Sequence, residues 1–313
     1  MKKLLLPVAV ALAATAASGQ DYPNKPIRML TSEVGGGTDT TTRPIARGLA
    51  DALGQQVIVE NRPSVIAVEL ATKASPDGYT LLFASGSFAI GPLLQKRPYD
   101  PVRDFTPITL ATSSFKILVV PPTGPAKSVK ELIALAKAKP GALNYGAGSL
   151  GAGAHLSAEL FKSMAGVDIV RVAYKGTGPS LIALMAGEVH LMFGSTPSTM
   201  PHVKAGRLRV LGISSAKPSA LVPGVPTIAA SGVPGYEFVS TDGIHAPAGT
   251  PAPIIRRLNQ EIVRFLNTPT AKETFFNAGL EIAATSPSES AAIIKSEIAR
   301  IGKVIKDAGI KVE

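Results

Sequence analysis

The residues of this chain that could do chemistry lie mostly in short loops rich in glycine and hydroxyl side chains. The first is the run 33–39, Glu-Val-Gly-Gly-Gly-Thr-Asp, whose three glycines leave the backbone N–H groups unshielded. Thr38 and Asp39 are good residues for a helix N-cap, and the free N–H groups at a helix start attract anions. We therefore expect this stretch to bind a negatively charged group.

Four later loops share this composition. They lie at residues 85–87, 146–153, 176–178 and 194–196, each between an apolar run and a helix-like segment. In an open α/β sheet such loops gather at the carboxyl ends of the strands, where ligands bind. A pocket of main-chain donors and hydroxyls suits one or two carboxylates without burying a lysine. For each loop taken singly, glycines that only make a tight turn are the alternative.

A catalytic function finds little support in the sequence. The run 146–151 has the G-x-G-x-x-G spacing of a dinucleotide-binding loop, but the next strand ends without the acidic residue that would hold a ribose. The same run approximates a nucleophile elbow at Ser149, with Asp242 and His245 later in the chain. Because those two lie three apart in an extended segment, their side chains would point to opposite faces. We therefore expect that the protein is not an enzyme, with a hydrolase that uses Ser149 as the alternative.

Metal ions and cofactors are not expected. The chain has no cysteine, which excludes disulfides, thiolate metal sites and cysteine nucleophiles. Its four histidines, His155, His190, His202 and His245, are isolated and lack the spacing of a metal site. His155 is expected on the surface of a helix, with contact to a ligand as the alternative.

The N-terminus has the pattern of a secretory signal peptide. Two lysines precede an apolar run at 4–14, and small residues up to Gly19 offer a cleavage site. A membrane anchor is the alternative, but the run is too short to span a bilayer as a stable helix. We therefore expect residues 1–19 to be removed and the mature chain to act in a bacterial periplasm.

The basic residues are too scattered for a nucleic-acid-binding protein. The net charge is +10, but no Lys/Arg run occurs and aromatic residues make up only 5% of the chain. Binding of nucleic acid would require a concentrated basic face or stacking aromatic side chains. A small anionic partner fits the charge better.

Strand-like and helix-like runs alternate from residue 26 onward. Ser128 with Glu131 and Ser286 with Glu289 are each typical of a capping box at a helix start. Two separate strands are expected at 105–111 and 116–120. The repeated units of strand, loop and helix predict an α/β fold with largely parallel, doubly wound sheets.

Several motifs occur together in one order. They are Tyr22-Pro23-x-Lys25-Pro26-Ile27-Arg28, Gly35-Gly36-Gly37-Thr38-Asp39, Val59-Glu60-Asn61-Arg62-Pro63, Pro76-Asp77-Gly78-Tyr79-Thr80, Tyr99-Asp100-Pro101-Val102-x-Asp104-Phe105, Tyr174-Lys175-Gly176-x-Gly178-Pro179 and Ala246-Pro247-Ala248-Gly249-Thr250-Pro251. With this order and spacing, the mature chain resembles, over nearly its whole length, the periplasmic solute-binding receptors of the tripartite tricarboxylate transporters (Bug-type, or TctC-like, receptors).

The resemblance implies a two-lobed, type II "Venus flytrap" binding protein with two doubly wound sheets and two interdomain crossovers. Residues 20–120 and 241–313 would form domain 1, and residues 121–240 domain 2. The implied ligand is a small carboxylate or related polar molecule, and the implied partners are the permease subunits of the transporter, for a receptor expected to be a monomer. A loaded receptor that contacts a signalling protein is the alternative. By motif, the ligand-binding residues would be Gly36, Gly37, Thr38, Asp39, Ser87, Ala147, Gly148, Ser149, Gly176, Thr177, Gly178, Ser195 and Thr196.

Three departures from the family pattern concern this pocket. The loop before the glycines is shorter and carries Glu33, which would repel a second carboxylate if it lined the cleft; a side chain that points to solvent is the alternative. A usually glycine-rich segment is replaced by the bulkier run 64–67, Ser-Val-Ile-Ala. An aspartate that often follows the Met-Phe pair is replaced by Gly194.

Overall fold

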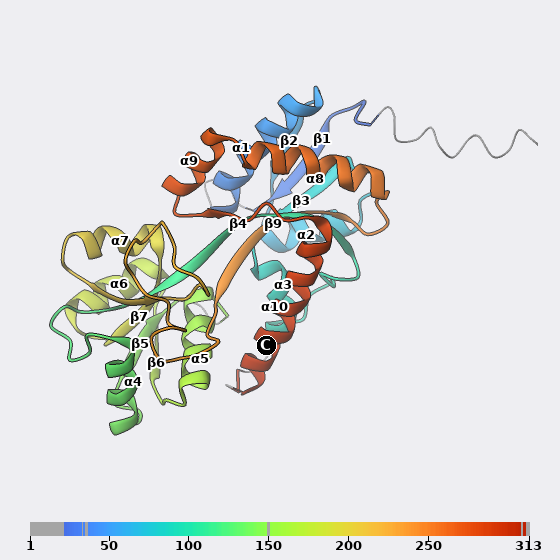
Figure 1. Ribbon diagram of the computed structural model, residues 1–313. Helices are drawn as coiled ribbons and strands as arrows, with labels where there is room; N and C mark the ends of the chain where they lie inside the picture. Colours follow the sequence, from blue (N-terminus) through green and yellow to red (C-terminus); the bar gives the residue numbers. More distant parts are fainter. Residues whose placement is uncertain (1–21, 33, 35–36, 149–150, 308, 311–313) are drawn as a thin grey trace, which may run out of the picture.

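Two lobes joined by a pair of long strands make up the computed structural model, which describes residues 22–32, 34, 37–148, 151–307 and 309–310 (Figure 1). Within these residues, no helix combines the length and the apolar character that a membrane span requires.

The first lobe is built on three parallel strands in the order β2-β1-β3, followed by the antiparallel β9. Its elements are β1 (Ile27–Thr31), α1 (Gly37–Leu53), β2 (Val57–Asn61), α2 (Ser64–Thr72), β3 (Thr80–Ala84), α3 (Ser87–Leu94), β9 (Val239–Pro247), α8 (Ala252–Leu266), α9 (Pro269–Asn277), β10 (Glu281–Ile282) and α10 (Pro287–Asp307). Helices α1 and α8 cover one face of the sheet and α2 and α3 the other, so two separate apolar clusters form.

The second lobe repeats this plan. Its elements are α4 (Val129–Ala138), β5 (Asn144–Ala147), α5 (Gly153–Ala165), β6 (Val170–Ala173), α6 (Thr177–Ala186), β7 (Leu191–Ser195), α7 (Thr196–Lys204) and β8 (Arg209–Ile213). Strands β7, β5 and β6 are parallel to one another. Helices α4 and α5 pack on one face and α6 and α7 on the other. The predicted α/β class with two doubly wound halves is therefore confirmed.

One strand, β4 (Phe105–Val120), belongs to both lobes. Its first part pairs with β9 as far as Phe115 with Val239, and its next residue, Lys116, pairs with Ser195 of β7. The prediction of two strands here was wrong. Residues 112–115, which lie between the two expected strands, pair with β9, so the strand continues across the junction.

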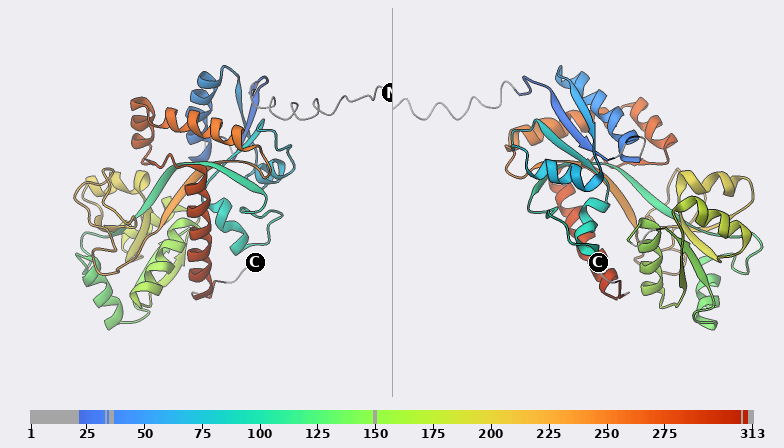
Figure 2. Two further views of the ribbon diagram at one scale, coloured as in Figure 1. Left: turned by 45° about the vertical axis from the view of Figure 1, so that its right-hand side comes forward. Right: turned by 180° about the vertical axis from the view of Figure 1, so that it is seen from behind.

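Helix α10 also links the lobes. It begins with the predicted capping box, in which Ser286 N donates to Glu289 Oε2 (2.8 Å) and Glu289 N donates to Ser286 Oγ (3.2 Å). It packs with both α3 and α5 (Figure 2). Its last turns place Ile301 and Val304 in the apolar cluster that contains α5. A helix of the first lobe thus buries part of its surface against the second.

Candidate functional site

The glycine-rich loops from the two lobes meet at the junction. The loops after β5 and β6 touch each other, because a Cβ built on Gly148 would lie 3.4 Å from the Gly176 Cα. The loop after β5 also reaches the other lobe, where a Cβ on Gly151 would lie 2.3 Å from Leu94 Cδ1. A Cβ at residue 151 would displace the Leu94 side chain, and the φ of +75° at this residue favours glycine.

Four helices that begin at this junction receive no side-chain hydrogen bond from their own N-cap residue. Helices α3, α5, α6 and α7 start after Gly86, Ala152, Gly176 and Ser195, which make no such bond. Each helix start carries the positive end of its dipole, and at α3 the Phe88 and Ala89 N–H groups donate to the carbonyl groups of Ser85 and Gly86. Together these helix starts favour an anionic guest.

A cavity of about 340 Å³ lies at the junction, within the range of roughly 300–1,000 Å³ that small-molecule sites occupy. The second lobe contributes Gly151 and Ala152, and Ile310 closes it from the C-terminal segment. The first lobe supplies the remaining lining residues, among them Ser32, Thr38, Ser64, Val65, Val68, Ser85, Ser87, Phe88, Ile90, Leu94, Arg97 and Tyr99.

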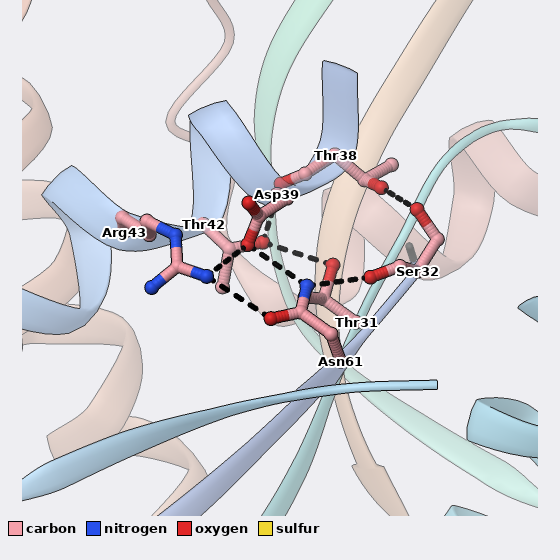
Figure 3. A network of polar contacts seen from close by, with 7 residues as sticks. All are labelled: Thr31, Ser32, Thr38, Asp39, Thr42, Arg43 and Asn61. Atoms are coloured by element: carbon pink, nitrogen blue, oxygen red, sulfur yellow. Dashed lines mark hydrogen bonds and ion pairs between the residues drawn. The ribbon is translucent and has the colours of Figure 1, made fainter. Parts of the chain in front are cut away.

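A polar network holds the β1–α1 loop in place (Figure 3). Asn61 Nδ2 at the end of β2 donates to Ser32 O (2.6 Å) and to Asp39 Oδ1 (2.9 Å). Asp39, which is 3% exposed, also pairs with Arg43 Nη2 at 2.9 Å. The hydroxyl of Thr38 instead bonds that of Ser32 beside the cavity. Asp39 thus ties the loop to β2, while Thr38 faces the cavity.

The prediction that Thr38 and Asp39 are helix N-caps was wrong. Helix α1 already begins at Gly37, so both residues lie inside its first turn. The run of glycines and threonines offers no sharp boundary, and the backbone turns into the helix earlier than the side-chain preferences suggest.

The other predicted residues lie in several environments. Ser87 lines the cavity, with its hydroxyl 2.7 Å from that of Ser85. Ala147 is fully buried at the end of β5, and the Gly148 carbonyl accepts from Arg171 Nη2 (2.6 Å). Thr177 is half-buried at the start of α6, between Gly176 and the exposed Gly178; Ser195 bonds Ser198, and Thr196 is buried. Glu33, Gly36 and Ser149 lie outside the described residues.

The structure explains why this chain tolerates Gly194. A Cβ at this position would lie 2.1 Å from the Thr199 hydroxyl, which fills the space beside the strand end. An aspartate at residue 194 would therefore require Thr199 to move. The absence of an aspartate at residue 194 and the presence of Thr199 are therefore linked, because the two side chains would occupy the same space.

Charged side chains occur where the two long strands cross the junction. Lys116 lies over the start of α5, with its Cε 2.9 Å from a Cβ built on Gly153. Asp242 of β9 accepts a hydrogen bond from the Gly86 N–H. Burial raises the pKa of Asp242 to about 7, against the opposing effects of Lys116 and this hydrogen bond, and burial lowers the pKa of Lys116. The sequence reasoning missed this pair because the two residues are distant in the chain.

Two histidines are buried. His155 is 3% exposed and its Nδ1 accepts from Gly151 N (3.1 Å), so the predicted helix-surface position was wrong. His245 packs between Phe88 and Phe105 in the core of the first lobe. Its Nδ1 has no hydrogen-bond partner among the described residues, so Asp242 does not orient it as in a catalytic triad.

Comparison with known proteins places this architecture in one family. Residues 41–310 match the tripartite tricarboxylate transporter family receptor. Protein BugT of Bordetella pertussis is 36% identical over 315 residues, which cover 98% of this chain and 96% of BugT. The solved structure of R. palustris Rpa4515 with adipate is 37% identical, with a TM-score of 0.74, over 92% of this chain and 99% of that one. MatC from Rhodopseudomonas palustris with bound malate is 28% identical, with a TM-score of 0.70, over 91% and 100%.

Proposed function

Because the chain belongs to the tripartite tricarboxylate transporter receptor family, we propose that it captures a small carboxylate between its lobes and delivers it to a membrane permease. The observation that carries this proposal is the group of helix starts at the junction whose N-cap residues make no side-chain hydrogen bond, those of α3, α5, α6 and α7. Relatives solved with adipate and with malate support a carboxylate as the ligand class.

In this proposal the two lobes hold the carboxylate from opposite sides. Thr38 and Ser87 of the first lobe offer hydroxyl donors, and the loops after β5, β6 and β7 offer backbone N–H groups from residues 147–149, 176–178 and 195–196. Gly37 adds an N–H group at the start of α1, and the family motif adds Gly36 to the proposed ligand-binding residues. Asp39 positions the loop through Asn61, and Glu33 belongs to the proposed set of ligand-binding residues.

Binding involves no covalent step, so the chain acts as a receptor and not as an enzyme. The mature protein, residues 20–313, works as a monomer in the periplasm after removal of residues 1–19. Domain 1 comprises residues 20–120 and 241–313, and domain 2 residues 121–240. Closure of the two domains over the ligand would present a combined surface to the permease.

Calorimetry on the mature protein with malate and adipate tests the proposal. Removing the hydroxyl in Ser87→Ala is expected to weaken binding about fivefold, because one donor to the carboxylate is lost. Ser75→Ala, at an exposed position of the same lobe, is the matched control and should bind as the wild type does. Failure of every carboxylate to bind or to raise the melting temperature would refute the proposal.

A further inference from the structure

Asp242 lies at the start of α3, one of the four helix starts at the junction. Its carboxylate accepts a hydrogen bond from the Gly86 N–H, and the two neighbours of this glycine, Ser85 and Ser87, both line the cavity. Strand β9 passes close to this point, because a Cβ built on Gly86 would lie 3.0 Å from Ser240 Oγ. Asp242 therefore occupies a helix start that would otherwise attract an anionic guest.

The charged groups around Asp242 come from β4, α10 and the segment before β9. Lys116 of β4 favours the ionised form of Asp242, although none of the ion pairs in the described residues includes this lysine. Glu297 of α10 is 5% exposed, and its pKa is raised by burial and, to a smaller extent, by the charges of Asp242 and Glu237. Arg300 lowers the pKa of Glu297, and α3 carries no charged side chain. Asp242 thus shares a largely buried site with one cation and a second acid.

A carboxylate that binds at the start of α3 would bring another negative charge beside Asp242. Two carboxylates in one buried site raise each other's pKa, because the ionised form of each disfavours that of the other. Burial already raises the pKa of Asp242 to about 7, so even the free protein holds this group partly protonated at neutral pH. In its neutral form the carboxyl gains an O–H, which can donate a hydrogen bond to a carboxylate of the guest.

We propose that Asp242 takes up one proton from solvent when the ligand binds and donates the resulting O–H to a carboxylate oxygen of the ligand. The proton stays on Asp242 while the ligand is bound and returns to solvent when the ligand leaves. Above about pH 7 the loaded receptor therefore holds one proton more than the free receptor, so a rise in pH weakens binding. This inference rests on the proposed function and adds the control of ligand affinity by pH.

Calorimetric titration of malate and of adipate into the mature protein, at about pH 6.5 and about pH 8.5, measures the effect. Both acids stay ionised at these values, since ordinary carboxyl groups titrate at roughly pH 4. The affinity of the wild type should fall about twentyfold between the two values, as expected when a group that titrates at about pH 7 takes up one proton. Asp242→Asn replaces the neutral acid by an amide of the same shape. It should bind equally at both values, and at about pH 8.5 it should bind about twentyfold more tightly than the wild type.

Other titrating groups are separated by further variants. Loss of the proton from Lys116 would also weaken anion binding as the pH rises, and burial lowers the pKa of this lysine. Lys116→Gln should lower the affinity at both values and move the fall in affinity to higher pH, because the lysine no longer favours the ionised Asp242. Glu297→Gln should keep the dependence on pH. Asp51→Asn, which removes a carboxylate from an exposed position of the same lobe, is the matched control and should behave as the wild type does.

A count of the protons gives an independent readout. At about pH 8, titrations in phosphate and in Tris buffer differ by the ionisation heat of the buffer multiplied by the number of protons taken up. The wild type should take up close to one proton per ligand, and Asp242→Asn close to none. Tighter binding by Asp242→Asn than by the wild type at high pH cannot result from misfolding, and the proton count of the wild type does not depend on any variant.

The possible results distinguish this inference from the function on which it rests. Equal affinity of the wild type at both pH values, or a dependence on pH that persists in Asp242→Asn and disappears in Lys116→Gln, would overturn the inference and leave a carboxylate receptor in place. Binding of no carboxylate at all would overturn the proposed function as well.

Discussion

Acidification should destabilise this protein partly through one buried histidine. His245 is 2% exposed, packed against the rings of Phe88 and Phe105. Burial lowers the pKa of His245 from 6.5 to about 4. His245 is therefore protonated near pH 6.5 in the unfolded chain but only near pH 4 in the folded chain. The stability due to the neutral ring is present above pH 6.5 and is lost as the pH falls toward 4.

The size of the effect follows from the shift. Each pKa unit corresponds to about 1.4 kcal/mol, so the two and a half units between 6.5 and 4 correspond to about 3 kcal/mol, most of it lost by about pH 4.5. For a protein of this size such a loss lowers the melting temperature by about 5 °C.

The assay compares variants, because other groups titrate in the same range. Burial also raises the pKa of Asp242 and of Glu297 to about 7, and these acids act in the opposite direction as the pH falls. His245→Leu removes only the histidine contribution, so its melting temperature should fall about 5 °C less than that of the wild type between about pH 7.5 and pH 4.5. His190→Gln, at an exposed position, is the control. Parallel pH profiles for wild type and His245→Leu would refute the reasoning.

Three further predictions follow from the buried polar groups. Asp39→Asn should lower the free energy of unfolding in urea by about 1–2 kcal/mol, because Asn61 and the half-exposed Arg43 lose the carboxylate that they contact. Ligand affinity should stay within about twofold of the wild type. A loss of affinity at unchanged stability would instead make Asp39 a ligand contact. Gly194→Asp should lower the melting temperature, because the aspartate and Thr199 compete for the same space. Combining Gly194→Asp with Thr199→Gly should restore part of the loss. Additive effects of the two substitutions in this double-mutant cycle would contradict the packing argument. Glu297→Gln should stabilise the protein more at pH 8 than at pH 5. The reason is that the pKa of this glutamate is higher in the folded state than in the unfolded state, so the folded protein loses stability as the carboxyl ionises. Thermal melts at the two pH values check this, and an equal change in melting temperature at both would count against it.

Sequence reasoning reached the architecture because its signals are local. The capping box at Ser286 depends on residues within one turn, and both of its hydrogen bonds are present in the structure. The alternation of strands and helices likewise predicted the α/β class, since each unit must bury one face. Where polar residues interrupted an apolar run, as at 112–114, the local signal was misleading, because pairing with a distant strand supplied the missing hydrogen bonds.

The sequence by itself determined the class of fold, the family motifs and the loops in which an anion could find backbone donors. The tertiary structure decided which of those donors share a cavity, and it added side chains that no motif contains, such as Leu94 and Arg97. It also brought Lys116 and Asp242 close enough at the junction to affect each other's pKa, and buried His155 and His245. The reason is physical: burial, charge proximity and the walls of a cleft arise from contacts between segments far apart in the chain, and a motif read along the chain carries no record of those contacts.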